Sequence, residues 1–425
     1  MKTEDEIQAV PDELRRAATD AGWSEDMVDR LARLHFTPDV IRMWLDGPLD
    51  RAKRGIEIIE RLSYGTIRLR DATYAPKDIS ALSDLFANAP EDIGDWEVTV
   101  ERSPNPLAQF GLQENHRVRI LEDGGLIIGA FAASARETFV AGQEITVSQM
   151  SGYRIRKDHR GQGFSQLLSW LPPAVGTPYS QGSWFHIRSQ NMASVQWINA
   201  LNPDMIKSSP QRDGDVPGID VCVLQYPARP SDGDRAGIRR ASGDDLDRCV
   251  ALINRTHDGA DLFTRYTAAA LRFQLDERIW GTKPDWWGRV YGWEDYCVLE
   301  ENGQIVACAG LWDKGRDVRE RWRLKETGDE KLIDATALLD FGFDQGREDA
   351  MARLIVHLIG MTHELGRGYL VAPLQLLPDV AARLEDHEPV PERRGLIWRT
   401  FDGNFNQLPE PDPPITRPYT DLAYW

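Results

Sequence analysis

The sequence predicts an α/β protein in which two similar mixed-sheet domains follow a helical N-terminal extension. Three observations support this fold class. Residues 144–156 alternate apolar and polar side chains like a long strand, and a glycine-rich turn and an apolar, helix-like segment follow. Strand patterns of the first half recur in the second half. A segment rich in proline, glycine and aspartate, residues 227–236, separates the halves as a linker.

A chain of 425 residues is too long for one ordinary core, so several domains are expected. Two echoes indicate a duplicated domain. Residues 237–240 repeat the pattern of residues 66–69, and residues 299–307 repeat that of 121–129, at offsets of about 171 and 178. We therefore expect a helical extension, a first domain, a second domain and a C-terminal tail, at 1–63, 64–228, 237–407 and 408–425.

Composition excludes several classes of function. The net charge of −17 disfavours nucleic acid as a partner and fits either a cationic substrate or a merely soluble surface. No apolar run reaches the 18 or so residues of a membrane helix, and the acidic start resembles no signal peptide. A cytoplasmic protein without membrane contact is expected. The four cysteines and eight histidines form no metal-binding pattern, so we expect no metal and reduced, buried cysteines.

The first domain is expected to contain strands, helices and one hairpin in a defined order. They are a strand at 66–70, a helix at 75–87, hairpin strands at 117–121 and 126–132, the long strand, the loop and its helix at 164–171, a strand at 184–188, a helix at 191–201 and a last strand at 221–226. The second domain is expected to repeat the end of this order, with a long strand at 335–343, a helix at 349–365 and a strand at 369–372. The loop at 344–348 keeps one glycine and adds a carboxylate.

The turn after the first long strand has the composition of a pyrophosphate site. Its sequence is Arg160-Gly161-Gln162-Gly163-Phe164-Ser165. Glycines let the backbone approach a ligand closely, and the free N–H groups and dipole of the following helix attract an anion.

This loop and its surroundings resemble the GCN5-related N-acetyltransferase (GNAT) family. The family's Gln/Arg-x-x-Gly-x-Gly/Ala signature is matched at Arg160 and Gly163, and Ser165 departs from it. Ile155 stands where the family has a valine before the loop. The family's Asn-x-x-Ala/Ser after the next strand corresponds to residues 191–194, Asn-Met-Ala-Ser.

The resemblance implies an enzyme that uses acetyl-CoA as co-substrate. The amides of Gly161, Gln162, Gly163, Phe164 and Ser165 would hold the CoA pyrophosphate, and Arg160 would add a charged contact. The backbone of Ile155 and Arg156 would pair with the pantetheine arm, and Asn191 and Ser194 would complete the site. The second domain, which lacks the loop pattern, looks like a degenerate copy that does not bind CoA.

The resemblance also suggests catalytic groups. Related N-terminal acetyltransferases carry a glutamate base five residues before the asparagine, and this chain has His186 there. An imidazole can do the same work, although His186 can equally be a structural histidine. Glu144 is a second candidate base, acting through water. The family's tyrosine acid is replaced by Ile198, so water, Tyr153, Tyr179 or direct thiolate departure must serve.

The protein is predicted to be an N-acetyltransferase that acts on the primary amine of a small, cationic acceptor. A homodimer of the protein is compatible with this prediction. A CoA-binding sensor or scaffold, or an enzyme that uses another acyl-CoA, are the alternatives. An aromatic group in the second half is either a packing patch or the wall of the acceptor pocket. It comprises Trp280, Trp286, Trp287, Tyr291 and Trp293.

Overall fold

The structure of the protein is a computed structural model. It describes residues 12–20, 22–25, 28–29, 61, 65–112, 116–140, 142–160, 162, 164, 182–188, 191, 219–230, 235–276, 291–374 and 377–400. The helix expected at 164–171, the helix expected at 191–201 and the C-terminal tail lie outside these residues apart from Phe164 and Asn191. The N-terminal extension is described in part, with helix α1 at Asp12–Asp20.

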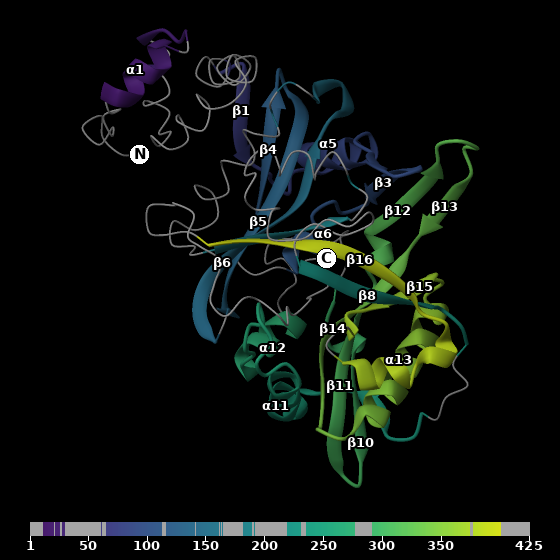
Figure 1. Ribbon diagram of the computed structural model, residues 1–425. Helices are drawn as coiled ribbons and strands as arrows, with labels where there is room; N and C mark the ends of the chain where they lie inside the picture. The colour runs from purple at the N-terminus through teal and green to yellow at the C-terminus, as the bar shows by residue number, and fades with distance from the viewer. Residues whose placement is uncertain are drawn as a thin grey trace.

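The N-terminal half consists mainly of long antiparallel strands with helix α5 packed on them (Figure 1). Its elements are β1 (Ile67–Asp71), α5 (Pro76–Ala87), β2 (Glu91–Ile93), β3 (Trp96–Arg102), α6 (Ala108–Gly111), β4 (Arg117–Asp123), β5 (Leu126–Val140), β6 (Gln143–Ile155), a 3-10 turn (Lys157–His159), β7 (Gly182–Arg188) and β8 (Ile219–Pro227). The expected strands and the first helix are confirmed to within a few residues, except that β5 runs well beyond its expected end.

The C-terminal half contains a similar set of elements in a partly different order. They are β9 (Ile238–Arg240), α11 (Leu246–Thr256), α12 (Ala268–Asp276), β10 (Tyr296–Glu301), β11 (Gln304–Trp312), β12 (Val318–Leu324), β13 (Glu330–Ile333), β14 (Ala335–Phe343), α13 (Glu348–Glu364), β15 (Tyr369–Ala372), α14 (Pro378–Ala382) and β16 (Val390–Thr400). The long strand β14, the helix α13 and the strand β15 match the expected ranges closely. The four strands β2, β3, β12 and β13, and the last strand β16, were not predicted.

Within the described part of the chain, 12 strands form one continuous sheet. Their order is β1-β4-β5-β6-β7-β16-β8-β15-β14-β11-β10-β9. The order reads the same way from both ends, because β1, β4, β5 and β6 on one side correspond to β9, β10, β11 and β14 on the other. The duplication inferred from the sequence echoes is therefore visible as an internal symmetry of the sheet.

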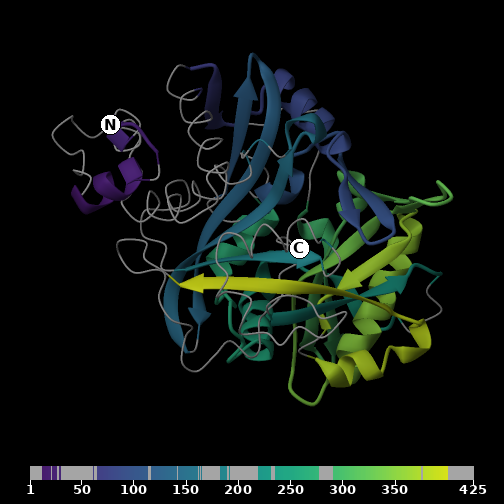
Figure 2. The same cartoon turned by 45° about the horizontal axis from the view of Figure 1, so that its top comes forward.

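The last strand of each half lies beside a strand of the other half. β16, at the end of the chain, pairs antiparallel with β7, and its opposite edge pairs with β8. β8, the last strand of the N-terminal half, pairs antiparallel with β15. Figure 2 shows β16 running between these strands at the centre of the molecule. This exchange joins the halves through backbone hydrogen bonds.

A second, smaller sheet also joins the halves. Its strand order is β13-β12-β3-β2, so each half supplies two adjacent strands. Ion pairs cross its central junction, where Arg321 of β12 meets Glu101 of β3 at 2.8 Å and Arg323 meets Glu97 at 2.6 Å. Cross-strand pairs of opposite charge stabilise such a ribbon by a few tenths of a kcal/mol each.

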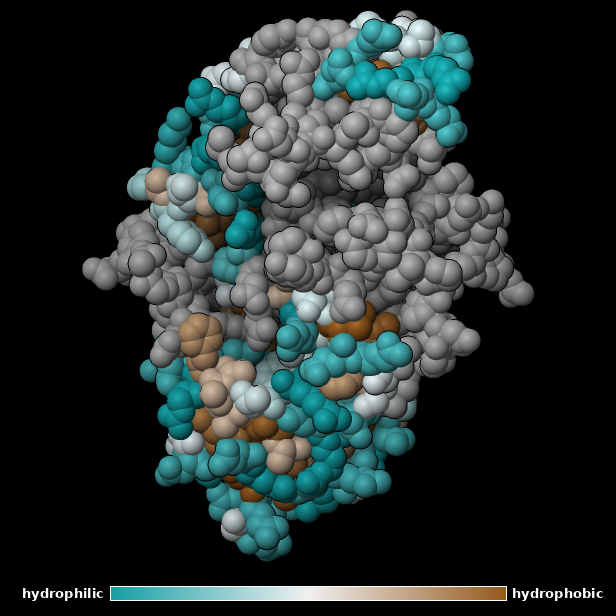
Figure 3. Space-filling model, turned by 90° about the vertical axis from the view of Figure 1, so that its left-hand side faces the viewer, coloured by the Kyte–Doolittle hydropathy of each residue, from teal (hydrophilic) through white to brown (hydrophobic). Residues whose placement is uncertain are grey.

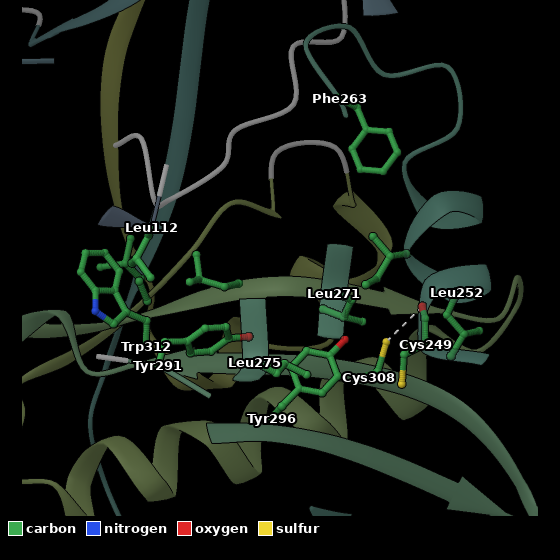
Figure 4. Packing of buried hydrophobic residues seen from close by; sticks show 14 of the residues in the cluster. Leu112, Cys249, Leu252, Phe263, Leu271, Leu275, Tyr291, Tyr296, Cys308 and Trp312 are labelled. Carbon is green, nitrogen blue, oxygen red and sulfur yellow. Dashed lines mark hydrogen bonds between the residues drawn. The ribbon is translucent and has the colours of Figure 1, made fainter. Parts of the chain in front are cut away.

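One hydrophobic core cluster spans both halves. It includes Leu112 and Trp184 from the N-terminal half and Trp312, Tyr291 and Tyr296 from the C-terminal half, all buried. Figure 4 shows Leu112 beside Trp312 in this cluster. On the face shown in Figure 3, the apolar residues of the described part lie in scattered groups among hydrophilic ones.

Some of the burial predictions for individual side chains are confirmed, and others are not. The cysteines Cys249, Cys297 and Cys308 are buried as expected, whereas Cys222, on β8, is only partly buried. Of the aromatic group, Tyr291 is buried and Trp293 is partly exposed. The remaining members of that group, Trp280, Trp286 and Trp287, lie outside the described residues.

Candidate functional site

The strands β6 and β7 form a wedge in the middle of the sheet. They run parallel but pair only at Val147–Gly182, Ser148–Ser183 and Gln149–Trp184. Beyond Gln149, β6 stays paired with β5, while β7 is paired with β16 along its whole length. Among the described residues, no strand pairs with this edge of β6 at residues 150–155, where a backbone could pair.

The backbone at the mouth of the wedge is fixed by β5. Ile155 ends β6 opposite Gly129 and is buried at 7% exposure. The Arg156 backbone N–H donates to the Ile128 carbonyl at 2.8 Å. The Arg156 side chain donates to the carboxylate of Asp84 in α5 at 2.5 Å. Arg156 is therefore a cation held at the end of the strand that the glycine loop follows.

The predicted loop is described only at three positions. The exposed Arg160 donates from Nε to the Ile155 carbonyl at 3.2 Å and from Nη2 to the Pro90 carbonyl at 2.6 Å. Gln162 donates to the Asp158 carbonyl at 3.3 Å, and Phe164 is buried against the sheet beside Ile155. These contacts hold both ends of the loop against the end of β6. Gly161, Gly163, Ser165 and Ser194 lie outside the described residues.

A glycine shapes β6 inside the wedge. Gly152 has φ +62°, and a Cβ atom at this position would lie 2.4 Å from Cζ of Phe110. The register between β5 and β6 shifts here, because Ala130 pairs with Arg154 but Ala132 pairs with Ser151. β6 therefore forms a bulge around Gly152. Only glycine combines this backbone conformation with the close approach of the aromatic ring.

His186 lies on the arm of the wedge that β7 forms. It is partly exposed, and its ring meets the buried Trp184 edge to face, with centroids 4.9 Å apart. The guanidinium of Arg136 lies 5.6 Å from the Trp184 ring and donates to the Leu262 carbonyl of the C-terminal half at 2.8 Å. Both halves of the protein therefore fix the place of His186.

Glu144 lies far from His186. It is exposed at the beginning of β6, opposite Phe139, five residues before the wedge opens at Gln149. Strands rise about 3.3 Å per residue, so Glu144 and Ile155 are separated by about 35 Å along β6. The structure does not bring the two proposed bases together, and only His186 lies at the wedge.

Tyr153 is the one candidate acid of the wedge that the structure describes. It packs beside Ile155 and Phe164, and its burial raises the pKa of its phenol well above the usual value. A phenol with a raised pKa keeps its proton at neutral pH, and the shift also makes it a weaker proton donor. Tyr179 lies outside the described residues.

Charged side chains gather beside the wedge, on β6, on β7 and on the strands of the small sheet. Arg154 of β6 pairs with Glu91 of β2, and Arg188 of β7 pairs with Glu320 of β12. Asn191 donates to Glu91 at 3.2 Å, which connects the predicted asparagine to this group. The two glutamates were missed in the sequence because the strands that carry them reach the wedge only through the small sheet.

The C-terminal half has a wedge of the same kind but with a different end. β14 and β15 pair only at Ala335–Tyr369, Thr336–Leu370 and Ala337–Val371. After β14 comes Asp344, whose carboxylate accepts from Arg255 at 2.6 Å and also from Arg248. This end therefore carries a carboxylate where the first half carries Arg156.

Among the described residues, no group of three or more His, Cys, Asp or Glu side chains is arranged to hold a metal ion. No helix in the described ranges is long and apolar enough to span a membrane.

Comparisons with known proteins identify the fold. No family model matches the sequence, and no curated protein matches it. The structure resembles Saccharomyces cerevisiae N-myristoyltransferase with bound myristoyl-CoA, with a TM-score of 0.56, 12% identity and coverage of 81% of this chain and 80% of that one. A second structure of that enzyme, with myristoyl-CoA and inhibitors, gives 0.54, 10%, 81% and 84%. The chain therefore has a tandem GNAT fold, which confirms the predicted fold class.

Proposed function

We propose that this tandem GNAT protein is an acyl-CoA-dependent N-acyltransferase whose N-terminal half binds the CoA thioester. The observation that carries the proposal is the wedge between β6 and β7, with the cation Arg156 at its mouth. A CoA molecule has the matching parts, since its pantetheine arm contains amides that can pair with a strand edge and its pyrophosphate is an anion.

The proposed arrangement follows the direction of β6. The pantetheine arm would pair with the open edge of residues 150–155, and the pyrophosphate would meet the loop at residues 160–165. Arg156 would lie near the phosphates. A phosphate would then compete with Asp84 for the guanidinium of Arg156 or bind it together with Asp84. The expected phosphate contacts from Gly161, Gly163 and Ser165, and the contribution of Ser194, remain part of this proposal.

A short acyl group suits the closed end of the wedge. Trp184 lies where β6 and β7 come together and is fully buried, with Arg136 packed on it. A bulky indole at this position leaves little depth for a long chain between the strands. This supports acetyl-CoA as the donor.

The proposed chemistry is direct transfer. The amine nitrogen attacks the thioester carbonyl carbon, the carbon–sulfur bond breaks, and CoA leaves as a thiolate. His186 would accept the proton that the ammonium must lose, and Tyr153 or water would protonate the thiolate. The bulged backbone at Gly152 would supply N–H groups near the carbonyl oxygen, a contribution of typically about 3 kcal/mol.

The acceptor is proposed to be a small molecule with a primary amine. Such an amine is cationic in solution, and the net charge of −17 favours its approach. The protein is proposed to act in the cytoplasm without nucleic acid or membrane, and a homodimer is compatible with the proposal.

The test is turnover with matched donors. Purified protein is incubated with acetyl-CoA or myristoyl-CoA and a panel of primary amines, while free CoA and product mass are measured. We expect CoA release with acetyl-CoA, and a loss of about 100-fold in kcat for His186→Gln with acetyl-CoA affinity retained. Glu144→Gln is the matched control and should change kcat little. Binding of acetyl-CoA without release would instead favour the sensor or scaffold.

A further inference from the structure

The charged group beside the wedge contains more arginines than carboxylates. Arg154 is paired with Glu91, and Arg188 is paired with Glu320. The third arginine of the group, Arg102 at the end of β3, lies within the electrostatic influence of Arg154 and both glutamates. It has no ion pair of its own among the described residues.

Arg102 is deeply enclosed. It is 7% exposed, and its guanidinium lies between the rings of Phe86 and Phe110, at 4.9 Å and 4.6 Å from their centroids. Its Nη2 donates to Oε1 of Gln109 at 2.8 Å. Its Nε and Nη1 are buried and have no acceptor.

This arrangement is costly without an anion. A buried charge with unpaired N–H groups loses its hydration and gains little in return, so proteins rarely keep one. Contact with two aromatic faces offsets part of that loss, but the Nε and Nη1 donors of the guanidinium stay without an acceptor. Burial and the neighbouring Arg154 lower the pKa of Arg102 to about 9, which still leaves it protonated at neutral pH.

The arginines converge on the proposed acceptor site. Arg154 lies on the β6 arm of the wedge and Arg188 on the β7 arm, and each has one further buried nitrogen without an acceptor. Phe110, which covers one face of Arg102, also touches the bulge at Gly152. Arg102 and the β6 bulge at Gly152 therefore share this buried ring as a neighbour.

We propose that Arg102, supported by Arg154 and Arg188, binds a carboxylate of the acceptor, so the substrate is an amino carboxylate with a free primary amine. The inference rests on the proposed function, because it assigns the substrate class of the same wedge. A single carboxylate balances the three arginines and two glutamates, whereas a phosphate dianion would exceed that balance. A carboxylate oxygen can also accept a charge-assisted hydrogen bond from a guanidinium nitrogen that has no other acceptor.

The experiment compares acceptors that differ only in the carboxylate. β-Alanine is paired with β-alanine amide, and glycine with glycinamide, using acetyl-CoA and measuring kcat/KM. For the wild type we expect a preference of about 100-fold for the acid. Arg102→Met should remove this preference while leaving kcat/KM for the amides within about twofold, and Arg102→Lys should restore part of it.

Arg321→Met is the matched control. Arg321 lies in the same small sheet and pairs with Glu101 and Glu330, but it is part-exposed. This variant should keep the full preference. An Arg102→Met enzyme that still prefers the acid, or a wild type that prefers the amide, overturns the inference. Where Arg102→Met fails to fold, Arg102→Lys decides by the same ratio.

Failure of the enzyme proposal is recognised separately. If no amine releases CoA, binding of β-alanine is measured by calorimetry in the presence of CoA. Binding to the wild type and to Arg321→Met, but not to the Arg102 variants, supports the carboxylate site without any turnover. Equal binding or no binding in all of them rejects it.

Discussion

The two halves of the large sheet close the space beside their long strands differently. In the C-terminal half, α11 packs directly on β14 at Gly342, where a Cβ atom would lie 2.4 Å from the Ile253 nitrogen. In the N-terminal half, α5 faces β6 across the side chain of Arg154, whose guanidinium lies 6.0 Å from the Phe86 ring. The glycine lets helix and strand meet, whereas the arginine brings charge between them.

The long strands also end differently. The residue after β6 is Arg156, which pairs with Asp84 of α5, and the residue after β14 is Asp344, which accepts from Arg248 of α11. The backbone is the same in both places, since each of these residues donates its N–H to the neighbouring hairpin strand at 2.8 and 2.9 Å. The sign of the charge at the strand end is thus reversed within a shared backbone geometry. Each of these charges is paired, Arg156 with Asp84 and Asp344 with Arg248 and Arg255.

A third feature is shared by both halves. Asp78 accepts two bonds from Arg70 and two from Thr73, all at 2.7–2.8 Å. Asp245 accepts in the same way from Arg239 and Ser242, at 2.7–2.9 Å. The frame that attaches the helix to the first strand is thus common to both halves, whereas the ends of their long strands differ.

The largest expected effect concerns the close helix contact. Gly342→Ala places a methyl group against the backbone of α11, which cannot turn away as a side chain can. We expect a loss of about 4 kcal/mol in the free energy of unfolding, measured by urea denaturation with circular dichroism. Gly152→Ala meets only the Phe110 ring and a positive φ, so about 2 kcal/mol is expected. Equal losses would contradict the comparison.

The shared aspartates should give equal effects of intermediate size. Hydrogen bonds from Arg70 and Arg239 lower the pKa of Asp78 and of Asp245 to about 2. Because the folded pKa lies below the unfolded value of about 3.9, this stabilisation is present above pH 4 and is lost as the pH falls toward 2. Asp78→Asn and Asp245→Asn should each remove about 2 kcal/mol at pH 7 and flatten the acid limb of the stability profile. A flattened limb in only one variant would break the equivalence.

The smallest expected effect concerns the reversed charge. Arg156→Asp places a second carboxylate beside Asp84 at the end of the first wedge, and we expect acetyl-CoA affinity to fall about tenfold, equal to about 1.4 kcal/mol, with a weaker dependence on salt. Asp344→Asn in the other half should leave the affinity unchanged. Titration calorimetry at two salt concentrations measures both. A loss of affinity in the Asp344 variant would place CoA in the second half instead.

Local patterns in the sequence predicted much of the fold. Three elements were predicted within a few residues: the alternating strand β6, the apolar strand β14 and the helix α13. Their patterns depend only on neighbours close in the chain. β3 and β12 were missed, although they alternate, because they become a sheet only by pairing across more than 200 residues. Their pairing follows from the relative position of the halves, which no local period encodes.

The candidate site shows the same division. The glycine loop was predicted because a phosphate site has a compact sequence pattern, and Arg156 was predicted from the family resemblance; their part in binding CoA stays a proposal. Arg102 was not found, because in the alternating stretch of β3 an arginine looks like an ordinary surface residue. Its burial becomes visible only when Phe86 and Phe110 are known to lie on either side of it.

The exchanged strand has a consequence for the time course of synthesis. β16 is the partner of β7, yet about 200 residues separate them, and a ribosome needs roughly 10–40 s to add that length. During this interval β7 presents an unpaired edge, which is a template for wrong pairing with other chains. The sheet of the N-terminal half is thus complete only after the end of the chain has been synthesised. Molecules truncated before residue 390 should therefore bind chaperones.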